Sequence, residues 1–110
     1  MYLNPSPEKF QLPVVCFVKV LFDVHCDWTG QEPDYRVYVN DELFTERTYA
    51  FTDSYLEEML QIEAPPGKYH IRCELVPPAF AHLRIENMRV EFGPGAIKGG
   101  NILRIRDEMA

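Results

Sequence analysis

Hydrophobic and polar positions alternate along most of the chain, which is the pattern of β-strands with one buried face. Between residues 14 and 28, every even position is apolar. The odd positions of this segment are mostly apolar up to Leu21 and polar from Asp23 to Asp27. The pattern predicts one long strand that is covered on both faces at one end and solvated on one face at the other.

Shorter alternating segments follow, separated by residues that favour turns. We expect strands at residues 35–39, 43–45, 48–52, 68–76, 82–92 and 101–107, and turns or loops at residues 29–34, 65–67, 77–78 and 92–101. Asn40 and Asp41 predict a tight hairpin, because both residue types tolerate positive φ. The apolar parity changes at Glu86-Asn87, which predicts a β-bulge.

Residues 54–64 fit two kinds of secondary structure. Ser54 with Glu57 forms a capping box, and the apolar residues match a helical stripe. Read with period two, Leu56, Leu60 and Ile62 share a face that Glu58 interrupts. Strand signals on both sides favour a strand here, and a short helix is the alternative.

The first thirteen residues predict an extended arm and not an element of the core. Pro5, Pro7 and Pro13 lack backbone donors and favour polyproline-like conformations. The apolar side chains of the arm, which include Tyr2, Leu3 and Phe10, indicate that it lies on its own domain or on a neighbour. Residues 14–110 then form one domain with about seven or eight strands, an all-β, antiparallel β-sandwich of jelly-roll type.

Composition and charge argue against several classes of function and location. The chain has 110 residues and a formal charge of -6, which argues against nucleic acid as a partner. No apolar run approaches the ~18 residues of a spanning helix, so we expect no membrane segment. The N-terminal residues lack the pattern of a signal peptide, so we expect an intracellular protein. The three cysteines have no CxxC spacing, which predicts reduced, buried thiols.

Candidate chemistry is sparse, and we predict no enzyme, no cofactor and no metal site. The three histidines, His25, His70 and His82, fall in predicted strands outside any catalytic motif. Asp23, His25 and Asp27 share the outer face of the long strand and could hold a cation. A solvated polar strip is the favoured interpretation of these three side chains.

Two aromatic side chains of the domain are candidates for contact with a ligand or partner. Trp28 stands beside the loop TGQEP, and Tyr38 is expected to point away from the core. Either ring could stack on a sugar or enter a pocket of another protein. We add Tyr2, Leu3 and Phe10 of the arm as possible partner contacts.

The segments GQEPDYRVYVNDELF, YLEEMLQIEAPPGKYHIRCEL and LRIENMRVEF resemble the small calcium-dependent xylan-binding family of carbohydrate-binding modules. This resemblance implies a jelly-roll sandwich. In that family the calcium ligands follow the strand that IRCEL resembles. Here the corresponding segment is VPPAFAH, which has no carboxylate, so no ligand is carried over.

The segments YVNDELFTERTYAF and YLEEMLQIEAPPGKY are similar to small proteins of marine tailed phages, notably T-even-like cyanophages. This resemblance implies a virion component, located in the host cytoplasm or in the virion. We therefore predict a non-enzymatic interaction module, a phage virion structural or accessory protein. Its partners would be proteins, in a homo-oligomer or a particle, and the arm would add a strand to a neighbour's sheet edge. The alternative is a carbohydrate-binding module that binds a glycan through Trp28 or Tyr38.

Overall fold

The computed structural model describes residues 15–51 and 54–106. The predicted arm, with Tyr2, Leu3 and Phe10, lies outside the described residues. Within them the chain forms eight β-strands and no helix. The all-β prediction is therefore confirmed for the described part of the chain.

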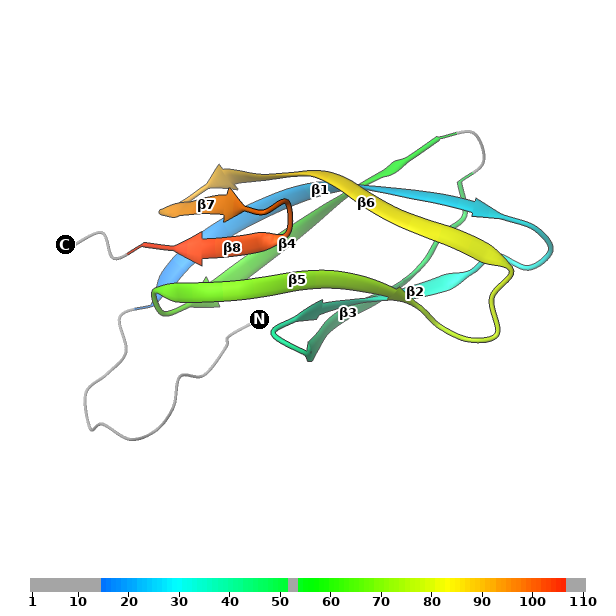
Figure 1. Cartoon of the computed structure of the whole chain (residues 1–110), viewed down its shortest axis with the longest axis horizontal. Coiled ribbons are helices and arrows are strands. Elements are labelled where there is room, and N and C mark those ends of the chain that lie inside the picture. The colour runs from blue at the N-terminus through cyan, green and yellow to red at the C-terminus, as the bar shows by residue number, and fades with distance from the viewer. Residues whose placement is uncertain (1–14, 52–53, 107–110) are drawn as a thin grey trace.

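The strands form two antiparallel sheets that pack face to face (Figure 1). The three-stranded sheet has the order β4 (Leu56–Ala64), β1 (Cys16–Trp28), β6 (Ala81–Phe92). The five-stranded sheet has the order β3 (Glu42–Thr48), β2 (Asp34–Val39), β5 (Gly67–Leu75), β8 (Ile102–Ile105), β7 (Gly95–Lys98). The β-sandwich is confirmed, and the jelly-roll connectivity stays a prediction.

The core lies between the sheets and follows the predicted parity. The even positions of β1 from Val18 to Val24 are fully buried. Side chains from both sheets complete the same cluster, among them Tyr35, Val37, Val39, Leu60, Ile62, Ile71 and Leu103. Removing these apolar surfaces from water is the main favourable term for the sandwich.

The ambiguous segment is the strand β4. It pairs with β1 from Cys16↔Ala64 to Val24↔Leu56 without a register shift. Leu60 and Ile62 point into the core, as the period-two pattern predicts. Tertiary pairing thus overrides the helix propensity of this segment.

The predicted hairpin and bulge are confirmed by the backbone. Asn40 and Asp41 have φ values of 49° and 65°, as the two central residues of a type I′ turn require. Leu21 of β1 pairs with Arg89 of β6, and Asp23 of β1 pairs with Glu86 of β6. Between these two pairs, β6 therefore has one residue more than β1. Such an extra residue shifts the outward-facing parity of a strand.

Two boundary predictions are wrong. The predicted loop 92–101 contains β7, which pairs with β8 and is too short to give an alternation signal. The strand predicted at residues 43–45 continues to Thr48, and residues 49–51 of the separate strand predicted at 48–52 are not in a strand, while residue 52 lies outside the described residues. Tyr49, which follows Thr48, is fully buried, and its hydroxyl donates a hydrogen bond to the Ser54 carbonyl at 2.6 Å. Because the Tyr49 ring enters the core, the chain leaves the sheet there.

Candidate functional site

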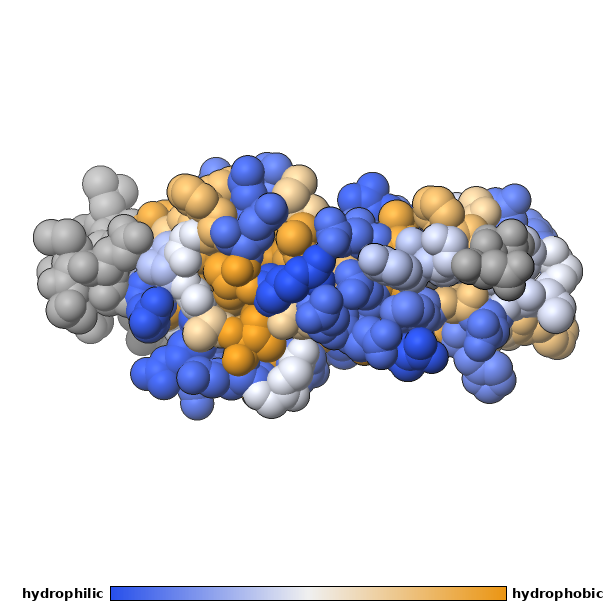
Figure 2. All heavy atoms as spheres, turned by 90° about the horizontal axis from the view of Figure 1, so that it is seen from above, coloured by the Kyte–Doolittle hydropathy of each residue, from blue (hydrophilic) through white to orange (hydrophobic). Residues whose placement is uncertain are grey.

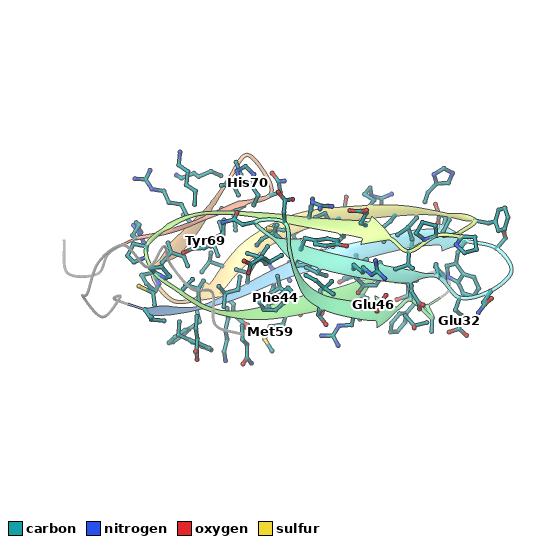
Figure 3. All side chains as sticks on the ribbon, turned by 90° about the horizontal axis from the view of Figure 1, so that it is seen from below. Glu32, Phe44, Glu46, Met59, Tyr69 and His70 are labelled. Atoms are coloured by element: carbon teal, nitrogen blue, oxygen red, sulfur yellow. The ribbon has the colours of Figure 1, made fainter. Side chains whose placement is uncertain are left out.

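The outer face of the three-stranded sheet divides into two halves along β1. We call Phe17, Lys19, Leu21, Met59 and Phe92 the apolar half, although the exposed side chains of Gln61 and Glu63 lie on the same face opposite Lys19 and Phe17. The register places Leu21 beside Met59 and Lys19 beside Phe92, so these side chains share one face. Met59 is 43% exposed and Phe92 is 58% exposed. Figure 3 shows Met59 pointing away from the sandwich.

Aromatic contacts tie this half together. The Phe17 and Phe92 ring centroids lie 6.0 Å apart, and the Lys19 Nζ lies 6.0 Å from each. Seen from above, apolar side chains gather on the half of the molecule that carries β7 and the end of β6 (Figure 2). The sequence pattern predicts cover over this end of β1. Within the described residues, no further layer covers it, because β1, β4 and β6 form one of only two sheets.

The edge strand beside the apolar half is β4. It has nine residues and pairs only with β1 among the described residues. Edges are normally protected by bulges, shortness or charge. In the described part of the chain, β3 and β6 carry register shifts and β7 has four residues, whereas β4 is regular. By length and regularity, β4 is therefore the described edge best suited to accept another strand, and the exposed Glu57 and Glu63 are its charged protection.

The second half of the outer face is held by ion pairs, and we call it the polar half. The Arg89 Nη1 lies 3.3 Å from Asp23 Oδ1, and its Nη2 pairs with Glu57. The Asn87 amide donates a hydrogen bond to the other Asp23 oxygen at 3.1 Å. The bulge in β6 positions Asn87 and Arg89 for these contacts. These side chains satisfy one another within the chain.

The predicted polar strip of β1 belongs to this half. The Nε2 of His25 lies 2.8 Å from the Glu86 carboxylate, and its ring stacks on Tyr55 with centroids 5.3 Å apart. Asp23 is paired with Arg89, as described above. Among the described residues, no three His, Cys, Asp or Glu side chains gather in a way that could hold a metal ion.

A buried carboxylate lies on the inner side of β4. Glu58 is 4% exposed and accepts hydrogen bonds from the Tyr35 hydroxyl at 2.8 Å and from the Arg47 Nε at 2.9 Å. Burial, followed by the hydrogen bond to Glu58, raises the pKa of Tyr35. The sequence pattern marks Glu58 only as an interruption of an apolar face. The partners come from β2 and β3, so local periodicity could not find them.

The three thiols differ in burial. Cys16 is buried, as predicted, whereas Cys26 and Cys73 are only half-buried, which corrects the expectation of three buried thiols. Burial raises the pKa of Cys73 to about 12, and the negative charge of Glu58 acts in the same direction. Because the thiolate is the reactive form of cysteine, this shift disfavours reaction at Cys73.

The two predicted aromatic contacts are both half-covered and lie on different sheets. Trp28 is half-buried, and its Nε1 donates a hydrogen bond to the Phe51 carbonyl at 3.0 Å. Tyr38 points away from the core as predicted, but the Arg72 guanidinium lies 4.2 Å from its ring centroid. The structure does not bring the two rings together.

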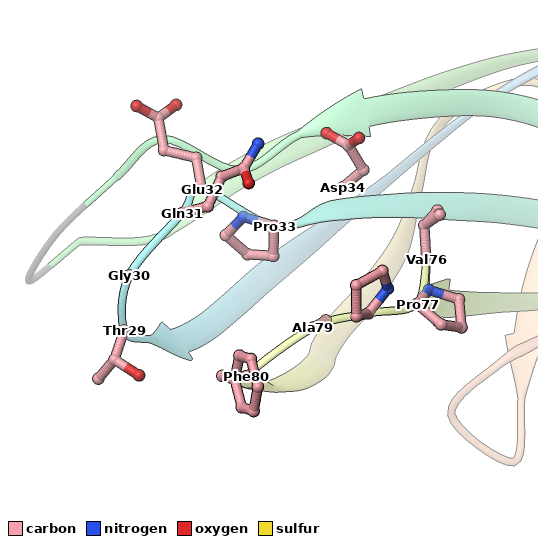
Figure 4. A pocket seen from close by; sticks show the side chains of 11 residues that line it. Thr29, Gly30, Gln31, Glu32, Pro33, Asp34, Val76, Pro77, Ala79 and Phe80 are labelled. Carbon is pink, nitrogen blue, oxygen red and sulfur yellow. The ribbon is translucent and has the colours of Figure 1, made fainter.

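Among the described residues, the most exposed aromatic is Phe80, at 81%. It follows Pro77-Pro78, which the pattern marks only as the end of a strand. Residues 29–34 and 76–80 line a hollow of about 390 Å³ at this end of the sandwich (Figure 4). We call it the end hollow. An aromatic residue placed directly after a proline turn is the sequence signal that could have indicated it.

The described residues include no helix that is long and apolar enough to cross a membrane. Comparisons of the chain with protein-family models, with curated proteins and with solved structures found no match.

Proposed function

We propose that this chain is a non-enzymatic interaction module that assembles through the apolar half of its outer sheet face and the adjoining β4 edge. The observation that carries the proposal is the exposure of Met59 on β4, a regular strand at the edge of the sheet among the described residues, together with the exposure of Phe92 on β6 of the same sheet face. Exposed large apolar side chains gathered on one face are typical of protein–protein contacts. A partner strand that pairs with an open sheet edge forms main-chain hydrogen bonds, which depend little on the partner's sequence.

The partner segment that we propose is the arm, residues 1–13, of a neighbouring copy. Between Pro7 and Pro13 lie five residues that can all donate to a ladder. At about 3.3 Å per residue they span roughly 16 Å, which matches about half of β4. Phe10 lies in this stretch, and Tyr2 and Leu3 precede it, so the arm also brings apolar side chains to an apolar surface.

The ionisable groups support a non-enzymatic role. Asp23, His25 and Glu58 each have a protein partner, and the elevated pKa of Cys73 keeps its thiol protonated. An acid–base pair in catalysis needs groups that converge on a substrate site. By the resemblance to tailed-phage proteins, we propose that the assembly is a virion and that this chain is a structural or accessory component.

Removal of residues 1–13 tests the proposal. We expect the truncated chain to lose its oligomers while keeping the circular dichroism spectrum of a folded sandwich. Light scattering measures the mass, and the full-length chain at the same concentration is the control. An unchanged mass after truncation would contradict assembly through the arm.

Glycan binding is the second candidate. The half-covered rings of Trp28 and Tyr38 do not favour it, and Phe80, the most exposed of the described aromatic side chains, could serve instead. Retardation of the chain on polysaccharide affinity gels, lost in Phe80→Ala but kept in Phe92→Ala, would support this second function.

A further inference from the structure

Basic side chains gather over three adjacent strands on the outer face of the five-stranded sheet. The register places Lys68 of β5 opposite Arg104 of β8, and His70 of β5 opposite Ile102 of β8. On the other side of β8, Lys98 of β7 is the cross-strand neighbour of Ile102. We call the exposed bases of this group the basic patch: Lys68, His70, Lys98, Arg104 and Arg106.

The basic patch points away from the core. The residues that alternate with its members on β5 and β8, Tyr69 and Leu103, are buried between the sheets. Arg106 directly follows β8, and its amide donates a hydrogen bond at 2.8 Å to the carbonyl of the residue before β7, so the pairing continues there. Figure 3 shows His70 on the side of the sandwich away from Met59. An inference from the patch therefore does not rest on the assembly surface.

The basic patch has no counter-charge among the described residues. None of its lysines and arginines forms an ion pair with a described residue, whereas all the other described arginines pair with carboxylates. On the same sheet face, Arg36 pairs with Glu46, and Arg72 pairs with Asp41 and Glu74. A chain of net charge -6 thus has most of its unpaired bases on one sheet face.

The arrangement of the basic patch costs stability in the isolated chain. Residues directly opposite each other in an antiparallel pair have Cβ atoms about 4.5–5.5 Å apart, and like charges at such positions repel. Lys68 and Arg104 form such a pair. Along β8 the bases form three rows, which are Arg106, then Arg104 with Lys68, then Lys98 with His70. Alternate positions of a strand repeat every ~6.6 Å, so the rows have about this spacing.

We propose that the basic patch binds an extended acidic segment of a partner protein, which runs along β8. In an extended chain, carboxylates at positions i, i+2 and i+4 repeat with the same spacing as the three rows. Each carboxylate would then meet the bases of one row, and the arginines can bind carboxylates in a bidentate manner. Ile102 and Ala96, which are half-buried between the bases, would contact the aliphatic parts of the acidic side chains.

A short acidic peptide fits the basic patch better than a nucleic acid does. The patch extends over three strands that are ~4.8 Å apart, so it is roughly 10 Å wide. Beyond it on this sheet face, Arg72 and Arg36 already pair with carboxylates. A longer polyanion would place its other phosphates over this neutralised surface, and the net charge of -6 would repel them.

The test measures binding of the full chain to the capped, fluorescent peptide Glu-Ser-Glu-Ser-Glu by anisotropy at low ionic strength. We expect binding that weakens as salt is added, and no binding of the neutral peptide Gln-Ser-Gln-Ser-Gln. The double variant Lys68→Gln with Arg104→Gln should raise Kd about tenfold, because it removes both bases of the central row.

The matched control is the double variant Arg36→Gln with Arg84→Gln, which changes the net charge by the same amount. Both of these arginines already have carboxylate partners, so Kd should change less than about twofold. Amide shifts caused by the peptide should be confined to residues 67–70, 95–98 and 102–106. The urea midpoint of the Lys68→Gln, Arg104→Gln variant should not fall, since the change removes a repulsion between opposed like charges.

Several outcomes would overturn this proposal. An unchanged Kd in the Lys68→Gln, Arg104→Gln variant, or an equal rise in the control variant, would show that the peptide does not depend on the basic patch. Tighter binding of a thymidine oligonucleotide with the same amide shifts would assign the patch to nucleic acid. The same shifts with inorganic phosphate at the concentration of the peptide would assign it to a free anion. None of these outcomes bears on the arm truncation, because residues 1–13 stay in place in all of these proteins.

Discussion

The two halves of the outer face of β1 differ in how their side chains are satisfied. In the polar half, Asp23 and Glu57 share Arg89, so the charges find partners inside the chain. In the apolar half, Met59 and Phe92 keep about half of their surface in contact with water. The outer face of β1 therefore has one half whose charges are paired within the chain and one half whose apolar side chains a partner could cover. An alternating pattern identifies the outward positions of both halves, but only the apolar half has exposed apolar area that a contact could bury.

The largest effect is expected from making the apolar half charged. Because Met59 and Phe92 are each about half exposed, burying the rest of their surface at a contact should contribute roughly 1.5–3 kcal/mol to association. The double variant Met59→Lys with Phe92→Lys should therefore raise the dissociation constant of the assembly about tenfold to a hundredfold. Analytical ultracentrifugation measures this constant.

The matched control for that experiment is Tyr55→Lys, which places the same charge at an exposed aromatic of the polar half. It should leave the dissociation constant of the assembly unchanged. If the double variant assembles as tightly as the original chain, the apolar half is not the contact surface. Retained cooperative unfolding of both variants would show that the charges act on association and not on the fold.

The next effect compares two neighbouring glutamates on β4. Glu58→Ala removes a buried carboxylate and leaves the Tyr35 hydroxyl and the Arg47 guanidinium without it. We expect a loss of about 3 kcal/mol in the free energy of unfolding. Glu57→Ala removes an exposed partner of Arg89 and should cost less than about 1 kcal/mol. Urea denaturation measures both, and equal losses would contradict the distinction between buried and exposed charge.

The smallest effect concerns the polar half alone. Asp23→Asn should lower the free energy of unfolding by about 0.5 kcal/mol at low salt, because its partner Arg89 is itself partly exposed. At about 1 M NaCl this difference should shrink but not vanish, because the Asp23 side chain is only 13% exposed and partly buried pairs are screened less than exposed ones. Thermal unfolding at both salt concentrations tests it. A larger loss that persists in salt would mean that the polar half stabilises the sheet more than its exposure indicates.

Sequence reasoning was most successful where the structure depends on neighbours in the chain. The turn at Asn40-Asp41 and the bulge near Asn87 are local backbone events, and residue type and parity predict them. The strand β7 and the end of β3 at Thr48 were predicted wrongly. The first is too short to show alternation, and the second depends on a ring that enters a distant core.

The candidate sites show the same division. Tyr38 points outward as its parity predicts, but the guanidinium that covers it comes from β5. Phe80 and the other residues that line the end hollow lie on two loops that are far apart in sequence, so no single segment indicates the hollow. In the sequence, Glu58 only interrupts an apolar stripe. In the structure, Tyr35 and Arg47 of the other sheet donate hydrogen bonds to its carboxylate.

The sequence by itself determined that this chain forms strands, which face of β1 is buried, and that its outward face changes from apolar to polar at Asp23. These follow from a backbone geometry that repeats every two residues. Only the tertiary structure decided which outward side chains found partners and which stayed uncovered. That outcome depends on how two sheets and the loops between them meet, and such contacts join residues whose separation along the chain has no fixed period.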